Sequence, residues 1–120
     1  MGILSRLKLT DFRNYAALDI ELAQGLNVFV GRNGQGKSNI LEAVSYLGLL
    51  RSFRGHQPKA MLRWGESSFG VSGELCPTDI EPGFTHISAM QGEKRSLKVN
   101  GTPVGKASDF INHFLCVTLA

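Results

Sequence analysis

The chain has 120 residues, 42% of them hydrophobic and 19% charged, with a formal net charge of +3. This length suits one domain with its own core, and this balance of apolar and charged residues excludes a largely disordered chain. Because no apolar run approaches the roughly 20 residues of a membrane-spanning helix, we expect a cytoplasmic protein without a membrane partner, in which the small positive charge permits a polyanionic ligand.

The N-terminal segment alternates polar and apolar residues. Leu7, Leu9 and Asp11 fall on one predicted face, and after a short connection at residues 13–15 the same pattern returns over residues 18–22. Alternation with period two indicates a half-buried strand. We therefore expect two adjacent strands with one solvated face.

A buried strand and then a helix are predicted next. Residues 26–30 are nearly all apolar and stand between two glycines, which indicates a strand that is covered on both faces and central in its sheet. From Lys37 onward the apolar residues recur at helical spacing. The predicted apolar face carries Ile40, Leu41, Val44 and Leu47, and the remaining faces carry Asn39, Glu42 and Ser45.

The second half of the chain favours an antiparallel meander. Alternation resumes over residues 69–75, a further strand is predicted over residues 84–90, and residues 97–99 run into Asn100-Gly101. That dipeptide is typical of a two-residue hairpin turn, because both positions tolerate positive φ. Residues 107–114 then have helical spacing, and residues 115–117 are expected to begin another strand.

A phosphate-binding loop stands between the predicted buried strand and the helix. Its pattern is G-x-x-x-x-G-K-[ST], and its context is the one that the mechanism requires. The glycines let the loop curl so that backbone N–H groups point at a polyphosphate, and the helix N-terminus adds partial positive charge. Lys37 is expected to reach the β- and γ-phosphates, and the Ser38 hydroxyl is expected to bind Mg²⁺. The sequence thus predicts ATP with Mg²⁺ as cofactors, held by Gly31, Arg32, Asn33, Gly34, Gln35, Gly36, Lys37 and Ser38.

Four stretches of the sequence resemble the RecF family of bacterial DNA-repair ATPases. They are residues 6–15 (RLKLTDFRNY), the loop at 31–38, residues 39–44 (NILEAV) and residues 51–55 (RSFRG). Many ATPases share the loop, so the specificity of the resemblance comes from the Phe-Arg-Asn-Tyr and Ser-Phe-Arg stretches on either side of it. The resemblance implies an α/β fold in which residues 1–120 form the lobe I portion of an ABC-ATPase head related to SMC heads. Such a head has a mixed sheet, a central P-loop strand and helix, and an antiparallel β meander.

The same resemblance implies a function and partners. RecF-type proteins bind single-stranded or gapped DNA in an ATP-dependent way, and they act with other recombination proteins in repair, replication and the SOS response. In such heads two protomers close over two ATP molecules, so an ATP-dependent homodimer is implied for full-length members. Arg13 and Asn14 match a position near the nucleotide in related heads, although a basic residue that merely closes a strand turn is the alternative.

Other motifs of this ATPase class are absent from the sequence. A Walker B strand needs several apolar residues before an Asp, and none of the aspartates Asp11, Asp19, Asp79 and Asp109 follows such a run. We therefore identify no catalytic residue and expect a fragment or a truncated gene product that binds ATP without efficient hydrolysis.

Basic residues interleave with aromatic ones over residues 51–65. Such a mixture can neutralise DNA phosphates and stack on bases, although charged loops are more often simply solvated. The DNA-contacting candidates are Arg51, Arg54, Lys59 and Arg63, with Phe53, His56 and Trp64 beside them.

Three other functions stay open from the sequence. A head fragment of an SMC-like chromosome-organising ATPase needs long heptad stretches downstream, and none begins before Ala120. A nucleotide-binding remnant that does not hydrolyse ATP is the second alternative. A small-molecule kinase shares the phosphate loop but has no reason to carry the Phe-Arg-Asn-Tyr turn.

Overall fold

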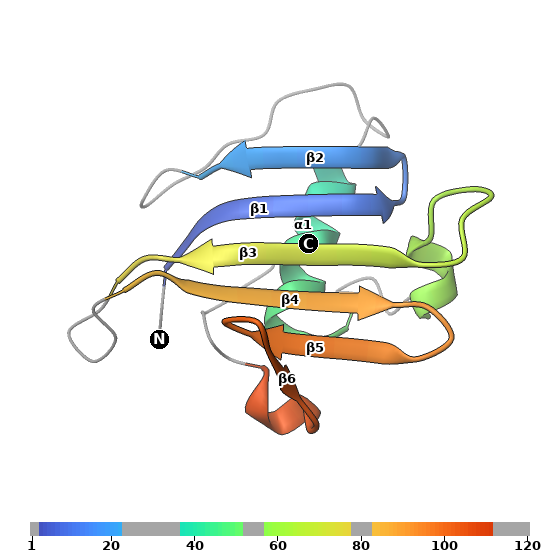
Figure 1. Ribbon diagram of the computed structural model, residues 1–120. Helices are drawn as coiled ribbons and strands as arrows, with labels where there is room; N and C mark the ends of the chain where they lie inside the picture. The colour runs from blue at the N-terminus through green and yellow to red at the C-terminus, as the bar shows by residue number, and fades with distance from the viewer. Residues whose placement is uncertain (1–2, 23–36, 52–56, 78–82, 112–120) are drawn as a thin grey trace.

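A six-stranded antiparallel sheet and one long helix make up the part of the chain that the computed structural model describes, residues 3–22, 37–51, 57–77 and 83–111. The elements are β1 (Leu4–Phe12), β2 (Tyr15–Glu21), α1 (Lys37–Leu49), the 3-10 helix η1 (Pro58–Met61), β3 (Phe69–Leu75), β4 (Thr85–Gln91), β5 (Arg95–Val99), β6 (Thr102–Val104) and the 3-10 helix η2 (Ala107–Asp109). The strands lie in the order β2-β1-β3-β4-β5-β6, and each neighbouring pair is antiparallel. Figure 1 shows α1 crossing one face of the sheet behind β1, β3 and β4.

The sequence predicted most of these elements. The two N-terminal strands are confirmed as β1 and β2, the helix after the phosphate loop as α1, and the meander as β3 to β6. The predicted helix at residues 107–114 is only a 3-10 turn within the described range, and Phe110 is buried at its end. The strands predicted at 26–30, including the expected central P-loop strand, and at 115–117 lie outside the described residues.

The hairpin between β5 and β6 turns at Asn100-Gly101, as predicted. Asn100 has a φ of 51° and Gly101 a φ of 79°, and Val99 pairs with Thr102 across the turn. Asn100 also bonds twice to β4, because its N–H donates to the His86 carbonyl at 2.7 Å and its Oδ1 accepts the His86 N–H at 2.8 Å. Asn100 therefore links the turn between β5 and β6 to the neighbouring strand β4.

The core lies between the sheet and α1, and two expectations about it are wrong. Asp11 does not continue the face of Leu7 and Leu9, because its φ of 52° turns the strand so that Phe12 enters the core instead. On α1, Leu41 is 45% exposed, although the helical pattern predicts it on the apolar face.

Two polar residues of α1 are buried against expectation. Glu42 is 0% and Ser45 2% exposed, although the helical pattern predicts both on outward faces. The buried face of α1 is therefore shifted around the helix from the predicted one. It carries Ile40, Glu42, Ala43, Ser45, Tyr46 and Leu47.

The helix packs closely on the sheet over Gly73 of β3. A Cβ built on Gly73 lies 2.6 Å from Leu4 Cδ1, 2.9 Å from the Arg6 carbonyl oxygen and 3.0 Å from Leu47 Cδ2. The two leucine atoms are ends of flexible side chains, but the Arg6 oxygen belongs to the backbone of β1. Glycine at this position therefore lets β1 and α1 pack on β3 at their present distance.

An aromatic cluster fills the core beside the β1–β2 turn. The ring of Phe69 makes edge contacts with Phe12 and with Tyr46, each at a centroid distance of 5.3 Å. The Tyr46 hydroxyl donates to Gln91 Oε1 at 3.4 Å. Burial raises the pKa of the Tyr46 phenol above its ordinary value of 10.0, and the positive charge of Arg95 offsets this only in part.

Within the described residues, none of the helices has both the length and the apolar character that crossing a bilayer requires.

We expect Gly73→Ala to lower the free energy of unfolding by about 1–3 kcal/mol, the usual cost of overpacking a core. Gly70→Ala is the matched control on the same strand, because a Cβ there meets Thr10 Cβ at 3.8 Å and Met90 Cε at 3.9 Å, which are ordinary contact distances. Urea denaturation followed by circular dichroism measures both variants. Equal stabilities would contradict the close approach at Gly73.

The raised pKa of Tyr46 predicts a loss of stability at high pH. The folded state holds the phenolic proton more tightly than the unfolded state, so the contribution is fully present below the ordinary pKa and is lost as pH rises through the folded pKa. We expect the wild type to lose more stability than Tyr46→Phe between about pH 9 and about pH 11, in urea titrations at both values. Parallel losses in the two proteins would exclude a raised pKa for this phenol.

Candidate functional site

The turn between β1 and β2 is held in place by a segment from further along the chain. Arg13 has a φ of 53°, and its N–H donates to the Met61 carbonyl at 2.8 Å. The Arg63 N–H donates to the Asp11 carbonyl at 3.0 Å, and Phe12 forms an isolated bridge with Leu62. The left-handed backbone at Arg13 thus has hydrogen bonds that fix it from outside the turn.

Arg13 makes a bidentate ion pair with Glu42 of α1. Its Nε lies 2.8 Å from Glu42 Oε1, and its Nη2 lies 3.1 Å from Glu42 Oε2. The Glu42 side chain is 0% exposed and that of Arg13 is 21% exposed, so the pair is largely removed from water. Truncating one member of such a pair leaves the other charge buried, at a cost of about 3–5 kcal/mol.

The next residue of the turn also bonds to the helix. Asn39 Nδ2 donates to Asn14 Oδ1 at 2.9 Å. Asn39 and Glu42 are at positions i and i+3 of α1, so they share one side of the helix. Two consecutive turn residues therefore hold two stacked helix residues, and we call these four residues, Arg13, Asn14, Asn39 and Glu42, the turn–helix clasp.

The clasp lies on the N-terminal half of α1, the half that follows the phosphate-loop sequence. Lys37 and Ser38 are the first residues of α1, and the loop residues Gly31 to Gly36 lie outside the described part of the chain. Glu42 is about 7.5 Å further along the helix axis than Lys37, at the standard rise per residue. The first turn of α1 contains no acidic residue. Its backbone N–H groups and dipole therefore favour an anion without a competing carboxylate in that turn.

The four predicted DNA-contacting residues are placed unequally. Arg51 is exposed just after α1, where its carbonyl accepts a hydrogen bond from Ser45 Oγ at 3.1 Å. Lys59 is exposed on η1, and Arg63 is half-buried in the segment that bridges to the β1–β2 turn. Arg54 lies outside the described residues. Trp64, beside Arg63, is 97% exposed.

The sequence did not identify Glu42 and Asn39 as site residues. The helical pattern predicts both as solvent-facing, and their partners are 29 and 25 positions away along the chain. One local signal was available, since Glu42 is a carboxylate surrounded by apolar neighbours in residues 40–44.

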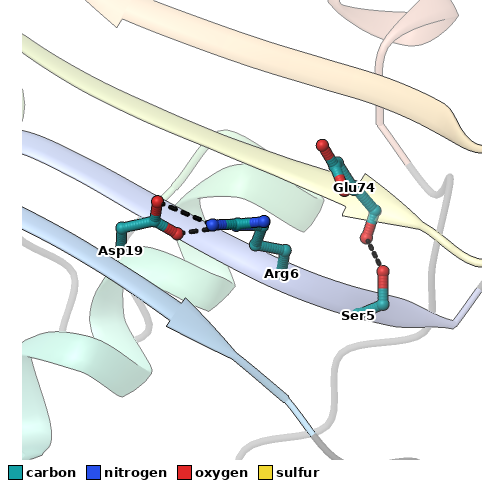
Figure 2. Close-up of polar contacts among 4 residues, drawn as sticks. All are labelled: Ser5, Arg6, Asp19 and Glu74. Atoms are coloured by element: carbon teal, nitrogen blue, oxygen red, sulfur yellow. Dashed lines mark hydrogen bonds and ion pairs between the residues drawn. The ribbon is translucent and has the colours of Figure 1, made fainter.

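A second bidentate ion pair lies on the sheet face opposite to α1. Figure 2 shows Arg6 of β1 and Asp19 of β2 side by side, with Nε–Oδ1 at 2.7 Å and Nη2–Oδ2 at 2.9 Å. The hydrogen bond from Arg6 lowers the pKa of the Asp19 carboxyl, but both side chains are exposed. An exposed pair of this kind contributes little to stability, so it serves as a natural comparison for the buried one.

No group of three or more potential metal ligands among His, Cys, Asp and Glu occurs within the described ranges.

Comparison with known proteins places this geometry in a family. Residues 3–113 match the RecF/RecN/SMC N terminal domain. A relative from Acidothermus cellulolyticus, DNA replication and repair protein RecF, is 40% identical over 117 residues, which make up 98% of this chain and 31% of the relative. A protein of the same name from Streptococcus suis is 42% identical over 118 residues, with 98% and 32% covered. The chain thus spans about a third of the length of these curated relatives.

Solved structures agree with the sequence relatives. The structure of the recombination mediator protein RecF with ATP superposes at a TM-score of 0.85 and 31% identity, over 94% of this chain and 31% of that one. An SMC head domain from Thermotoga maritima superposes at 0.70 and 22% identity, over 88% of this chain and 40% of that one, and it supports the fold alone. The described residues have the fold of the N-terminal lobe of a P-loop ABC-ATPase head.

Proposed function

The chain belongs to the RecF/RecN/SMC N-terminal domain family, and on this premise we propose that it binds ATP with Mg²⁺ as the nucleotide-binding portion of a RecF-type DNA repair and replication protein. The observation that carries the proposal is the phosphate-loop sequence running into α1, a helix whose first turns are held against the sheet by the clasp. A polyphosphate is the ligand that suits a glycine-rich loop at a helix N-terminus.

The residues around the start of α1 fit this ligand. Lys37 supplies a flexible positive charge for the terminal phosphates, and the Ser38 hydroxyl is the Mg²⁺ ligand expected of this motif. The absence of acidic residues from the first turn of α1 leaves the helix dipole available to the anion. Arg13 and Asn14 are proposed to lie beside the nucleotide, because the clasp attaches both to the helix that Lys37 begins.

DNA is the proposed macromolecular partner, single-stranded or gapped, in recombinational repair. Support comes from Arg51 and Lys59, which are exposed, and from Arg63 next to the exposed Trp64. Cations can pair with phosphates while an aromatic ring stacks on an unpaired base. We further propose a cytoplasmic location, other recombination proteins as partners, and an ATP-dependent homodimer in the full-length protein.

A chromosome-organising SMC-type head is the second candidate, favoured by the shared head fold. The two candidates differ in the segment that comes after this lobe, since an SMC head continues into a long coiled coil. The expectation of ATP binding without efficient hydrolysis by these 120 residues stays a prediction.

Lys37→Ala and Gly36→Val are expected to abolish tight ATP binding while leaving the fold largely intact. Lys37→Ala removes the charge that faces the phosphates, and a side chain at Gly36 crowds them. Titration with a fluorescent ATP analogue and Mg²⁺ measures the loss, which we expect to reach at least about tenfold, or 1.4 kcal/mol. Lys8→Ala, an exposed lysine on β1, is the matched control. Wild-type affinity in either loop variant would exclude the assignment.

Replacing Arg51, Lys59 and Arg63 together by Ala is expected to weaken DNA binding and to reduce its salt dependence. Each lost phosphate contact lowers the slope of log affinity against log salt by roughly 0.9 for duplex DNA or 0.7 for a single strand. Fluorescence anisotropy with labelled gapped DNA at several salt concentrations measures the slope. The control removes two exposed lysines elsewhere, Lys94 and Lys106. An unchanged slope in the triple variant would mean that this segment does not contact DNA.

A further inference from the structure

We propose that Glu42 is a positioning residue for nucleotide binding, which holds the Arg13 guanidinium beside the first turns of α1, and that Asn39 does the same for Asn14. The proposal rests on the proposed ATP binding and adds to it the residues that orient the turn. Neither Glu42 nor Asn39 belongs to the phosphate-loop motif.

The geometry of the ion pair fixes an orientation as well as a distance. Both oxygens of Glu42 are engaged by two nitrogens of Arg13, at 2.8 and 3.1 Å. A bidentate contact of this kind sets the plane of the guanidinium, which a single contact from a lysine does not. Arg13 is therefore presented in one defined direction relative to the axis of α1.

The cost of the pair argues for a role beyond holding the fold. Glu42 is 0% exposed, among the apolar residues that pack α1 onto the sheet. Burying two charges costs several kcal/mol in desolvation, and well-packed apolar residues in place of such a pair are often as stabilising or more so. Apolar residues would join the turn to the helix at lower cost but would leave no oriented cation beside the N-terminal half of α1.

The backbone conformation of the turn also fixes the position of Arg13. Arg13 adopts a φ of 53°, which is unfavourable for a residue with a side chain, and its N–H is held by the Met61 carbonyl. Asn14 is held independently by Asn39, one helical turn before Glu42. The turn is thus attached to α1 at two points, so it cannot move away from the helix without breaking both contacts.

The proposal predicts that Glu42 acts on nucleotide affinity through Arg13. Glu42→Gln keeps the size of the side chain but removes its charge and the second acceptor. We expect it to lower the affinity for a fluorescent ATP analogue with Mg²⁺ by about tenfold, within the range by which residues remote from a ligand modulate its binding. Arg13→Gln should cause a similar or larger loss, and the double variant should lose no more than Arg13→Gln alone.

The control is the exposed ion pair of the same geometry. Asp19→Asn breaks the bidentate contact with Arg6 on the opposite face of the sheet and should leave nucleotide affinity unchanged. Urea denaturation of every variant gives the folded fraction under the binding conditions, and affinities are corrected for it. Asn39→Ala tests the second point of the clasp with a less buried residue and should cost several-fold in affinity even if Glu42→Gln folds poorly.

Two results would overturn the proposal while leaving ATP binding intact. One is wild-type affinity in folded Glu42→Gln and Asn39→Ala, and the other is losses that multiply in the double variant of Arg13 and Glu42. Absence of nucleotide binding by the wild-type chain would instead overturn the proposed function, and this proposal with it.

Discussion

The contact on which the arrangement of this lobe depends is the buried ion pair between Arg13 and Glu42. It joins a tight turn of the sheet to the helix that begins with the phosphate-loop lysine. A buried charge pair tolerates little displacement, because each charge has lost its water and depends on the other. The relative position of sheet edge and helix is therefore set by directional polar contacts at one end, and by apolar packing along the rest of the helix.

The apolar packing imposes its own limit. Gly73 lets the helix and β1 approach β3 so closely that a single methyl group would meet a backbone oxygen. Phe12, Phe69 and Tyr46 fill the space between that approach and the turn. The helix is thus held close to the sheet at one place and is oriented by the clasp at another. Two such constraints at separate places fix the direction of the α1 axis relative to the sheet.

Local patterns predicted the features that depend on neighbours in the chain, and missed those that depend on distant residues. Alternation identified the strands, and the Asn100-Gly101 turn could be predicted from the φ that its residues tolerate. The buried face of α1 was predicted incorrectly, because helical periodicity places charged residues on the solvent side. Glu42 is buried all the same, since its charge is paired with that of Arg13, 29 positions earlier in the chain. The residues adjacent to Asp11 in the sequence give no indication of its positive φ. The backbone there is held by a distant segment, through the bridge between Phe12 and Leu62.

The strand order has a consequence for how the chain folds. β1 and β2 are joined by a short turn, and β3 to β6 come one after another as neighbours, so each set consists of local pairings. The ladder between β1 and β3 is the junction of the two sets, and it closes a loop that contains the whole stretch between Phe12 and Phe69. Closing this loop lowers the conformational entropy of the chain before the contacts of the ladder have formed. It is therefore slow compared with hairpin formation. Because α1 contacts β1 of one set and β3 and β4 of the other, its packing can be completed only after the two sets have met.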